Sequence, residues 1–154
     1  MGITITEIAS GEEQQVLDLV GRVFDSEVAP AYSSEGNEEF HRYLSIEDFR
    51  RRIQTNHRVF VAKDTAGTIV GALEIRDSFH ISLLFVREDL QRSGIGRALL
   101  KEAIAVAKAA GTISMTVNSS PNAVTGYESF GFRAVADEQI INGIRFIPMV
   151  MMLQ

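Results

Sequence analysis

The chain has 154 residues, of which 45% are hydrophobic, carries a formal net charge of −5 and contains no cysteine. This length is enough for one domain with its own core, so we expect a single domain over residues 1–154. The lack of cysteine excludes disulfides, thiolate metal sites and a cysteine acyl-enzyme, and it favours a cytoplasmic location. The acidic balance argues against binding to nucleic acid. We also expect no membrane span and no secretory signal, because no apolar run is long enough.

The first third of the chain is predicted to be mainly helical. Residues 3–8 alternate between apolar and polar at period two, which predicts a strand. After a loop at Pro30–Asn37, capping residues predict two further helices. The helix starts are, in order, a capping box at Ser10–Glu13 that opens a helix through Phe24, the segment Asn37–Phe40, and Ser45, whose helix runs to about Gln54.

Three strands are predicted next, at Val59–Ala62, Thr68–Ile75 and His80–Val86. The last two strands are expected to pair, and their hydrophobic pattern selects one register. The expected apolar pairs are Leu73 with Leu83 and Ile75 with Ile81; the expected polar pairs, on the opposite face, are Glu74 with Ser82 and Arg76 with His80. A slip of one residue would mix the two sets.

The second half begins with an apolar helical stripe from Ile95 to Ala107, ending near Gly111. The elements expected after it are a strand at Ile113–Asn118, a short helix from Ser120-Pro121 to Gly131, and strands at Phe132–Ile141 and Ile144–Leu153 joined by an Asn142-Gly143 turn. This order predicts an α/β fold with one mixed sheet.

The segment Gln91–Arg97, which reads QRSGIGR, lies between a predicted strand and a predicted helix. Glycines let a ligand approach the backbone closely, and a helix start offers unpaired N–H groups, so this segment is a candidate anion-binding loop. A P-loop would need Lys-Ser or Lys-Thr after its second glycine, and a dinucleotide loop would need a third glycine. The chain has Arg97-Ala98 and Leu99 at those places.

The glycine loop matches the pattern Q/R-x-x-G-x-G/A, and a second motif follows in the order Ala123, Tyr127 and Gly131-Phe132. With both motifs, the chain resembles the GNAT superfamily of N-acetyltransferases over its whole length. The resemblance implies a mixed central sheet of about seven strands with four to five helices, splayed between strands 80–86 and 113–118. It implies acetyl-CoA as the acyl donor and no metal.

The second motif departs from the family pattern at two positions. Ser120 stands where the family often has asparagine, with Asn118 and Asn122 on either side, and Gly126 replaces a large apolar residue. By resemblance, backbone groups of the strand bind the pantetheine arm and those of the loop bind the pyrophosphate. The implied cofactor-binding residues are Leu84, Phe85, Val86, Gln91, Arg92, Ser93, Gly94, Ile95, Gly96, Arg97, Asn118 and Asn122. Gln91 either binds the cofactor or caps the loop, and Arg92 and Arg97 face either the phosphates or solvent.

The resemblance also suggests catalytic residues. Tyr127 occupies the family position of the acid that protonates the leaving thiolate; the alternative is a buried aromatic with a hydrogen-bonded tip. His80 and Glu74 share a predicted face and are candidate bases, each with a structural role as the alternative. A water relay could replace both. His41 and His57 are read as surface residues.

The acceptor is expected to be a small-molecule or peptide amine. Glu35, Glu38 and Glu39 either attract that amine or satisfy a helix N-terminus. One alternative function is a non-catalytic CoA-binding sensor or interaction module on the same fold; a second is a nucleotide-binding protein. Finally, an apolar strand at Ile144–Leu153, if left at a sheet edge, would favour a homodimer.

Overall fold

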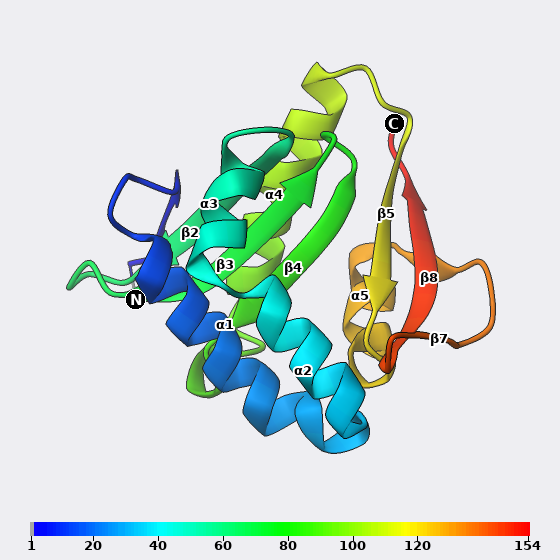
Figure 1. Cartoon of the computed structure of the whole chain (residues 1–154). Helices are drawn as coiled ribbons and strands as arrows, with labels where there is room; N and C mark the ends of the chain where they lie inside the picture. Colours follow the sequence, from blue (N-terminus) through cyan, green and yellow to red (C-terminus); the bar gives the residue numbers. More distant parts are fainter. Residues whose placement is uncertain (1) are drawn as a thin grey trace.

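The computed structural model describes residues 2–154, which form one mixed sheet flanked by helices (Figure 1). The strands follow the order β1-β2-β3-β4-β5-β8-β6, and β7 pairs with β8. The strands are β1 (Thr4–Glu7), β2 (His57–Lys63), β3 (Ile69–Arg76), β4 (His80–Val86), β5 (Ser114–Ser119), β6 (Arg133–Ala134), β7 (Gln139–Ile141) and β8 (Ile144–Met152). The predicted mixed α/β fold is confirmed. None of the helices in residues 2–154 has both the length and the apolar character required to cross a membrane.

Helices cover both faces of the sheet, so two cores form. The helices are α1 (Glu13–Glu27), α2 (Ser34–Tyr43), α3 (Ile46–Ile53), α4 (Ile95–Ala109) and α5 (Val124–Phe130), with short 3-10 turns η1 (Ala29–Ala31), η2 (Glu88–Leu90) and η3 (Pro121–Ala123). One core packs α4 and α5 on the sheet around Leu73, Leu99 and Met115. The other packs α1 and α3 on the opposite face around Val20, Phe49 and Val61. Strand β3 is therefore buried on both sides, and all its residues except Glu74 and Arg76 are apolar.

Two predicted helix starts are wrong. The side chain of Ser10 does not cap α1, which begins at Glu13; instead, Glu12 Oε1 accepts a hydrogen bond of 2.9 Å from the N–H of Ala9. Helix α2 begins at Ser34 rather than at Asn37, because Ser33 Oγ accepts from the N–H of Gly36 at 3.2 Å. The predicted start of α3 is confirmed, with Ser45 as its cap.

The pairing of β3 with β4 differs from the predicted register. Ile75 pairs with Ile81 and Arg76 with His80, as expected. A bulge then shifts the ladder, so that Glu74 pairs with Leu83 and Leu73 with Leu84. The extra residue is Ser82. The predicted pairs Leu73–Leu83 and Glu74–Ser82 are therefore wrong, and Leu83 packs into the core beside α1 instead of the core beside α4.

The C-terminal strands also differ from prediction. The expected strand 132–141 is two short pieces, β6 and β7, and both pair with β8. Because β5 pairs with the other side of β8, this strand is not at an edge. The argument from an exposed edge strand for a homodimer is therefore wrong in its premise, and dimerisation stays an untested prediction. The Asn142-Gly143 turn is confirmed, with φ of 53° and 80°.

The β7–β8 hairpin packs against α2 through two glycines, in a contact that we call the glycine strap (Gly36 and Gly143). A Cβ atom on Gly36 would lie 2.1 Å from the carbonyl oxygen of Gly143, so neither position has room for a side chain. Beside the strap, the Tyr32 hydroxyl donates to the carbonyl of Arg145 at 2.8 Å, and Arg145 Nη1 donates to the carbonyl of Ala31 at 2.9 Å. The strap joins segments that are far apart in sequence across the open end of the splayed sheet.

Candidate active site

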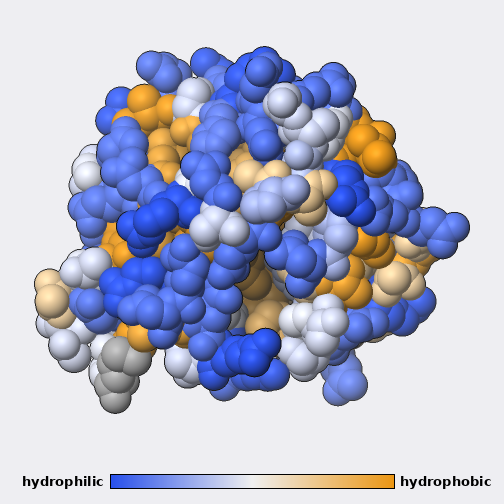
Figure 2. Space-filling model, turned by 90° about the horizontal axis from the view of Figure 1, so that it is seen from below, coloured by the Kyte–Doolittle hydropathy of each residue, from blue (hydrophilic) through white to orange (hydrophobic). Residues whose placement is uncertain are grey.

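A cleft opens where β4 and β5 diverge. The two strands pair in parallel only at His80 with Thr116 and at Ile81 with Val117. Beyond these pairs β4 continues to Val86 along β3, and within residues 2–154 it has no partner strand on its β5 side. The predicted splay is therefore confirmed. The cleft between the strands has a volume of about 1080 Å³, and Figure 2 shows a hollow near the middle of the lower face with apolar residues in its floor.

The unpaired part of β4 provides backbone donors and acceptors to this cleft. Leu84, Phe85 and Val86 line it, and each pairs with β3 on its other side. An edge strand presents N–H and C=O groups at alternate residues, so an extended amide-containing chain could pair with it. This arrangement fits a pantetheine arm, which carries two amides.

The glycine loop closes one end of the cleft. Arg92 and Gly94 have positive φ values of 63° and 92°, and α4 starts at Ile95 without a side-chain cap. Within residues 2–154, the N–H groups from Arg92 to Arg97 donate to no protein acceptor. These N–H groups and the positive end of α4 could therefore hold an anion such as a phosphate.

Most of the predicted cofactor-binding side chains line the cleft. Besides the three β4 residues, the members that do so are Gln91, Arg92, Gly94, Gly96, Arg97, Asn118 and Asn122. Ser93 and Ile95 do not: Ile95 is buried in the core beside α4, and the Ser93 hydroxyl donates to the carbonyl of Leu90. These two residues can contribute only through their backbone N–H groups.

Two amide side chains already bind protein groups at the end of α1. Gln91 Nε2 donates to Glu27 Oε1 and to the carbonyl of Val86, at 3.0 Å each. Asn122 Nδ2 donates to the carbonyl of Glu27 at 2.8 Å. Of the two alternatives for Gln91, this geometry supports the structural one, in which its amide holds the loop against β4. Glu27 was missed by the sequence analysis, and no local motif distinguishes it.

The two predicted arginines lie at the mouth of the cleft. Arg97 Nη2 lies 3.4 Å from the carbonyl of Ser129, and its guanidinium lies 5.1 Å from the centre of the Phe130 ring. Both Arg92 and Arg97 are exposed. Exposed arginines at this position can form charge-assisted hydrogen bonds with a phosphate while their side chains stay largely solvated.

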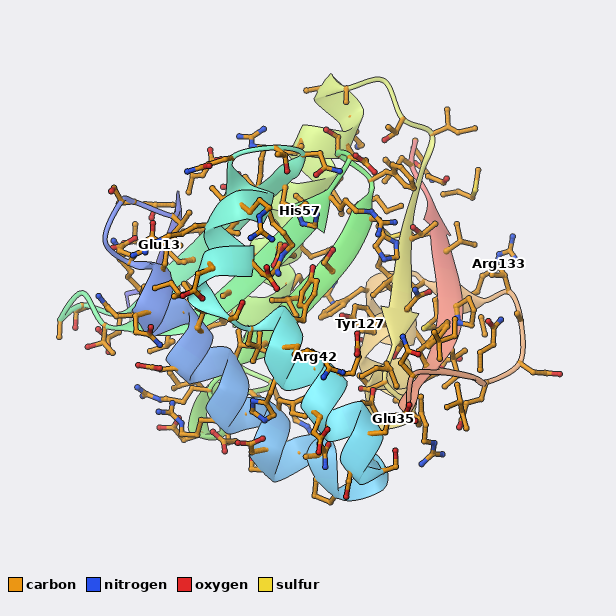
Figure 3. The ribbon with its side chains drawn as sticks, in the orientation of Figure 1. Glu13, Glu35, Arg42, His57, Tyr127 and Arg133 are labelled. Atoms are coloured by element: carbon orange, nitrogen blue, oxygen red, sulfur yellow. The ribbon has the colours of Figure 1, made fainter. Side chains whose placement is uncertain are left out.

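Tyr127 faces the cleft from α5, and Figure 3 shows it in the region where β4 and β5 diverge. Its ring packs edge-on against Phe132, with centroids 5.5 Å apart. Burial raises the pKa of its hydroxyl above the usual value of 10.0. This hydroxyl has no hydrogen-bond partner in residues 2–154. A neutral hydroxyl without a protein partner is available to donate to a ligand, which fits the predicted acid better than a hydrogen-bonded structural tyrosine.

His80 also lines the cleft, at the point where the strands separate. Its Nδ1 lies 2.7 Å from Thr116 Oγ1. Burial, together with the nearby Arg76, lowers the pKa of His80 from 6.5 to about 4. The imidazole is therefore neutral at pH 7, and a neutral imidazole can accept a proton.

The shifted pKa of His80 makes the stability of the fold sensitive to acid. Because the unfolded chain binds the proton more tightly, this contribution is complete above pH 6.5 and is lost as the pH falls towards 4. We expect the free energy of unfolding, measured with urea, to fall between pH 7 and pH 5 by about 1 kcal/mol more in the wild type than in His80→Gln. His41→Gln, at a histidine whose side chain is 44% exposed, is the control. Equal losses in the wild type and His80→Gln would contradict this expectation.

Glu74 lies outside the cleft. Its side chain is 1% exposed and is held by Arg52 Nε at 2.7 Å and by the Tyr43 hydroxyl at 3.2 Å. His57 Nδ1 lies 2.5 Å from the same carboxylate, although not in hydrogen-bond geometry. The prediction that His57 is a surface residue is wrong, since the residue is 8% exposed. A role for Glu74 as a base in contact with substrate has no geometric support, so we retain it only as a residue that positions Tyr43.

Tyr43 and Arg52 were missed by the sequence analysis. Tyr43 lines the cleft, and the Arg52 guanidinium stacks 3.5 Å above its ring. Burial, and next the charge of Glu74, raise the pKa of Tyr43 to about 12. Arg52 is the last of three consecutive arginines, and nothing in the sequence marks it as the one that pairs with Glu74. Removing one partner of such a buried ion pair typically costs about 3–5 kcal/mol.

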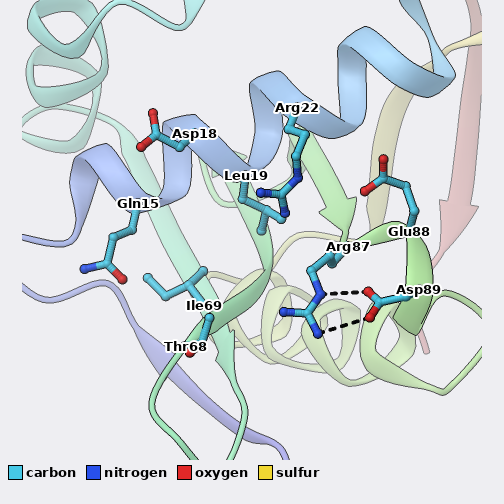
Figure 4. A pocket seen from close by; sticks show the side chains of 9 residues that line it. All are labelled: Gln15, Asp18, Leu19, Arg22, Thr68, Ile69, Arg87, Glu88 and Asp89. Carbon is cyan, nitrogen blue, oxygen red and sulfur yellow. Dashed lines mark hydrogen bonds and ion pairs between the residues drawn. The ribbon is translucent and has the colours of Figure 1, made fainter.

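A second hollow lies between α1 and the loop after β4 (Figure 4). It has a volume of about 550 Å³ and contains charges of both signs, including Arg22 and Asp18. Within the loop after β4, Arg87 Nε donates to Asp89 Oδ1 at 2.7 Å (Figure 4). The hollow shares no lining residue with the cleft. Within residues 2–154, no three histidine, aspartate or glutamate side chains gather as metal ligands, there or elsewhere.

The sequence of the chain matches one protein-family model over most of its length. The model of the acetyltransferase (GNAT) domain matches residues 28–153. The chain belongs to the GNAT acetyltransferase family. The match runs from η1 to β8, and the cleft residues of α1, which are Val23, Phe24 and Glu27, precede it.

Solved GNAT structures share the fold. A GCN5-related N-acetyltransferase from Rhodopseudomonas palustris superposes with a TM-score of 0.84 at 20% identity, over 99% of this chain and 97% of that chain. PaiA N-acetyltransferase from Thermoplasma acidophilum, in complex with coenzyme A, gives 0.81 at 19%, over 99% and 100%. An aminoglycoside 6′-acetyltransferase type Ii gives 0.71 at 16%, over 97% and 96%. A search of curated protein sequences finds no significant match.

Proposed function

We propose that this GNAT protein is an acetyl-CoA-dependent N-acetyltransferase that transfers an acetyl group to a primary amine. One observation carries the proposal: the unpaired edge of β4, the uncapped start of α4 and the free hydroxyl of Tyr127 all face one cleft. They match, respectively, the amides, the phosphates and the sulfur of acetyl-CoA. A solved relative of the same fold is a complex with coenzyme A, which supports the choice of ligand.

The amine is proposed to attack the thioester carbon directly. A carbon–nitrogen bond forms, the carbon–sulfur bond breaks, the amine proton passes to neutral His80 or to water, and Tyr127 protonates the leaving thiolate. A freed N–H of β4 stabilises the oxyanion. With no cysteine in the chain, a covalent acyl-enzyme would need a poorer nucleophile, so a ternary complex is favoured. The protein is further proposed to act in the cytoplasm.

Calorimetric titration tests the ligand. We expect acetyl-CoA to bind with micromolar affinity, whereas ATP and NADH should bind at least ~10-fold more weakly, since they lack the pantetheine arm that pairs with β4. Coenzyme A carries both the phosphates and the amides, whereas pantetheine carries only the amides. Comparing their affinities therefore measures what the phosphates contribute. Tighter binding of ATP or NADH would contradict the proposal.

Turnover distinguishes the enzyme from a sensor. Release of free thiol from acetyl-CoA should depend on an added amine, and initial-rate lines should intersect when both substrates are varied. Parallel lines with acetyl retained on the protein would indicate a ping-pong route instead. Tight binding without thiol release, over a broad panel of amines, would support the non-catalytic CoA-binding module.

A further inference from the structure

The part of the cleft on the α1 and α2 side of the sheet is lined mainly by aromatic and aliphatic residues. We call this part the acceptor chamber, and its walls are Phe24, Tyr32, Phe40, Tyr43, Ile141 and Phe146. Tyr127 belongs to the opposite side of the sheet, with α5. The splay between β4 and β5 connects the two sides, so a group in the chamber can approach a thioester held beside Tyr127.

The chamber wall is ordered by ring packing. The rings of Phe24 and Phe40 stack with centroids 3.9 Å apart, and Phe40 contacts the Phe85 ring of β4 at 6.0 Å. Tyr32 packs edge-on against Phe24 at 5.6 Å. Packed rings of this kind form a preformed apolar surface, which favours ligands that bury an apolar group against it.

The glycine strap limits the width of the chamber. The carbonyl of Gly143 lies against Gly36 with no space between them. Just before α2, the Tyr32 hydroxyl donates to the carbonyl of Arg145 and so holds α2 close to β8. A bulky or branched polar substrate would have to separate α2 from the hairpin. A compact substrate would not.

The six residues that form the chamber walls carry no charge, and the nearest charged groups of the cleft are largely paired. Glu39 bonds Arg42 at 2.6 Å, and Arg76 pairs with Asp77 at 3.5 Å. His80 is neutral at pH 7, since its pKa is about 4. A substrate with several ammonium groups would lose water against these walls, and the carboxylates that line the cleft, Glu27 and Glu39, already accept from Gln91 and Arg42. Only the neutral form of an amine attacks a thioester, and an apolar chamber favours that form.

We propose that the acceptor is a monoamine that carries one aromatic or compact apolar group, of the 2-phenylethylamine type, rather than a polyamine, an aminoglycoside or a lysine-rich peptide. This inference rests on the proposed acetyltransferase function. The apolar group lies against Phe24, Phe40 and Ile141, and the amino group points through the splay towards the thioester. Acetylation then gives an N-substituted acetamide and free coenzyme A.

Thiol release from acetyl-CoA tests the proposal with three probes, 2-phenylethylamine, spermidine and kanamycin. We expect kcat/KM for 2-phenylethylamine to exceed that for each polycation by ~10- to 100-fold, the range given by burial of one ring. A preference for spermidine or kanamycin would overturn the inference. Acetyl-CoA binding without turnover of 2-phenylethylamine would overturn it as well.

A matched pair of variants locates the chamber. Ile140 and Ile141 are neighbours on β7 and are 65% and 57% exposed, but only Ile141 lines the cleft. Ile141→Glu should raise the KM for 2-phenylethylamine by ~10-fold and reduce its advantage over spermidine, whereas Ile140→Glu should change neither. Equal effects of the two substitutions would overturn the assignment of the chamber.

Calorimetry with acetyl-CoA separates this inference from the proposed function. Both variants should bind acetyl-CoA as the wild type does, because β7 pairs with β8 and carries none of the residues assigned to cofactor binding. If the wild type binds acetyl-CoA and prefers a polycation, the inference fails alone. If the wild type binds no acetyl-CoA, the proposed function fails and the inference fails with it.

Discussion

Replacing Gly96 by valine should lower the affinity for acetyl-CoA by roughly 100-fold or more, because the phosphates would lose close approach to the start of α4. Hydrogen bonds to a charged group contribute about 1.5–3 kcal/mol each, and one or two of them account for such a loss. A Cβ atom at Gly96 would meet only Phe130 and Val86, at 3.6 Å and 3.9 Å, so alanine fits there. The two further methyl groups of valine would extend between these side chains. Calorimetric titration measures the change.

A graded series separates loss of binding from loss of folding. Gly96→Ala should weaken binding less than Gly96→Val. Ala105→Val adds the same type of side chain to an exposed position of α4 and should bind acetyl-CoA normally. All three variants should retain the circular dichroism of the wild type, since β-branched residues cost a helix less than about 1 kcal/mol. A folded Gly96→Val protein with unchanged affinity would remove the glycine loop from the proposed site.

Replacing Tyr127 by phenylalanine should reduce kcat by roughly 100-fold, the usual contribution of a positioned general acid. Folding and acetyl-CoA affinity should change little, because the hydroxyl bonds no residue in 2–154 and the ring still packs against Phe132. Steady-state rates with a fixed amine, combined with calorimetry, separate kcat from binding.

The pH dependence provides an internal check. Burial raises the pKa of Tyr127, so the hydroxyl keeps its proton at alkaline pH. At pH values up to 10, loss of this proton should therefore not reduce the wild-type rate. The deficit of the Tyr127→Phe variant should then be constant between pH 7 and pH 9. Equal turnover by the two proteins at neutral pH would exclude Tyr127 from the mechanism.

Elements that depend on local sequence were predicted well. The bounds of β4, the Ser45 cap of α3 and the Asn142-Gly143 turn all match the structure. Each depends on a few neighbouring residues, through an alternating apolar pattern, a capping side chain or a tolerance of positive φ. The strand–loop–helix geometry of the glycine loop belongs to the same class, since it is set by the backbone of one short segment.

Features that depend on distant partners were not predicted. The bulge at Ser82 moves Leu83 to the other core, and no pattern within β3 and β4 reveals it. The burial of Glu74 depends on Arg52 and His57, which come from α3 and β2. Likewise, the apolar strand β8 looked like an edge strand until the pairing of β6 and β7 with it was known.

The sequence by itself therefore determined the family resemblance, the strand–loop–helix unit and the identity of the candidate acid, because these follow from motifs and from backbone preferences within a few residues. The tertiary structure decided which side chains face the cleft. Residues such as Glu27, Tyr43 and Ile141 lie far apart in the chain and come together only when α1, α2 and β7 pack around the splay. Contacts of this kind depend on strand order and helix packing, which local periodicity does not specify.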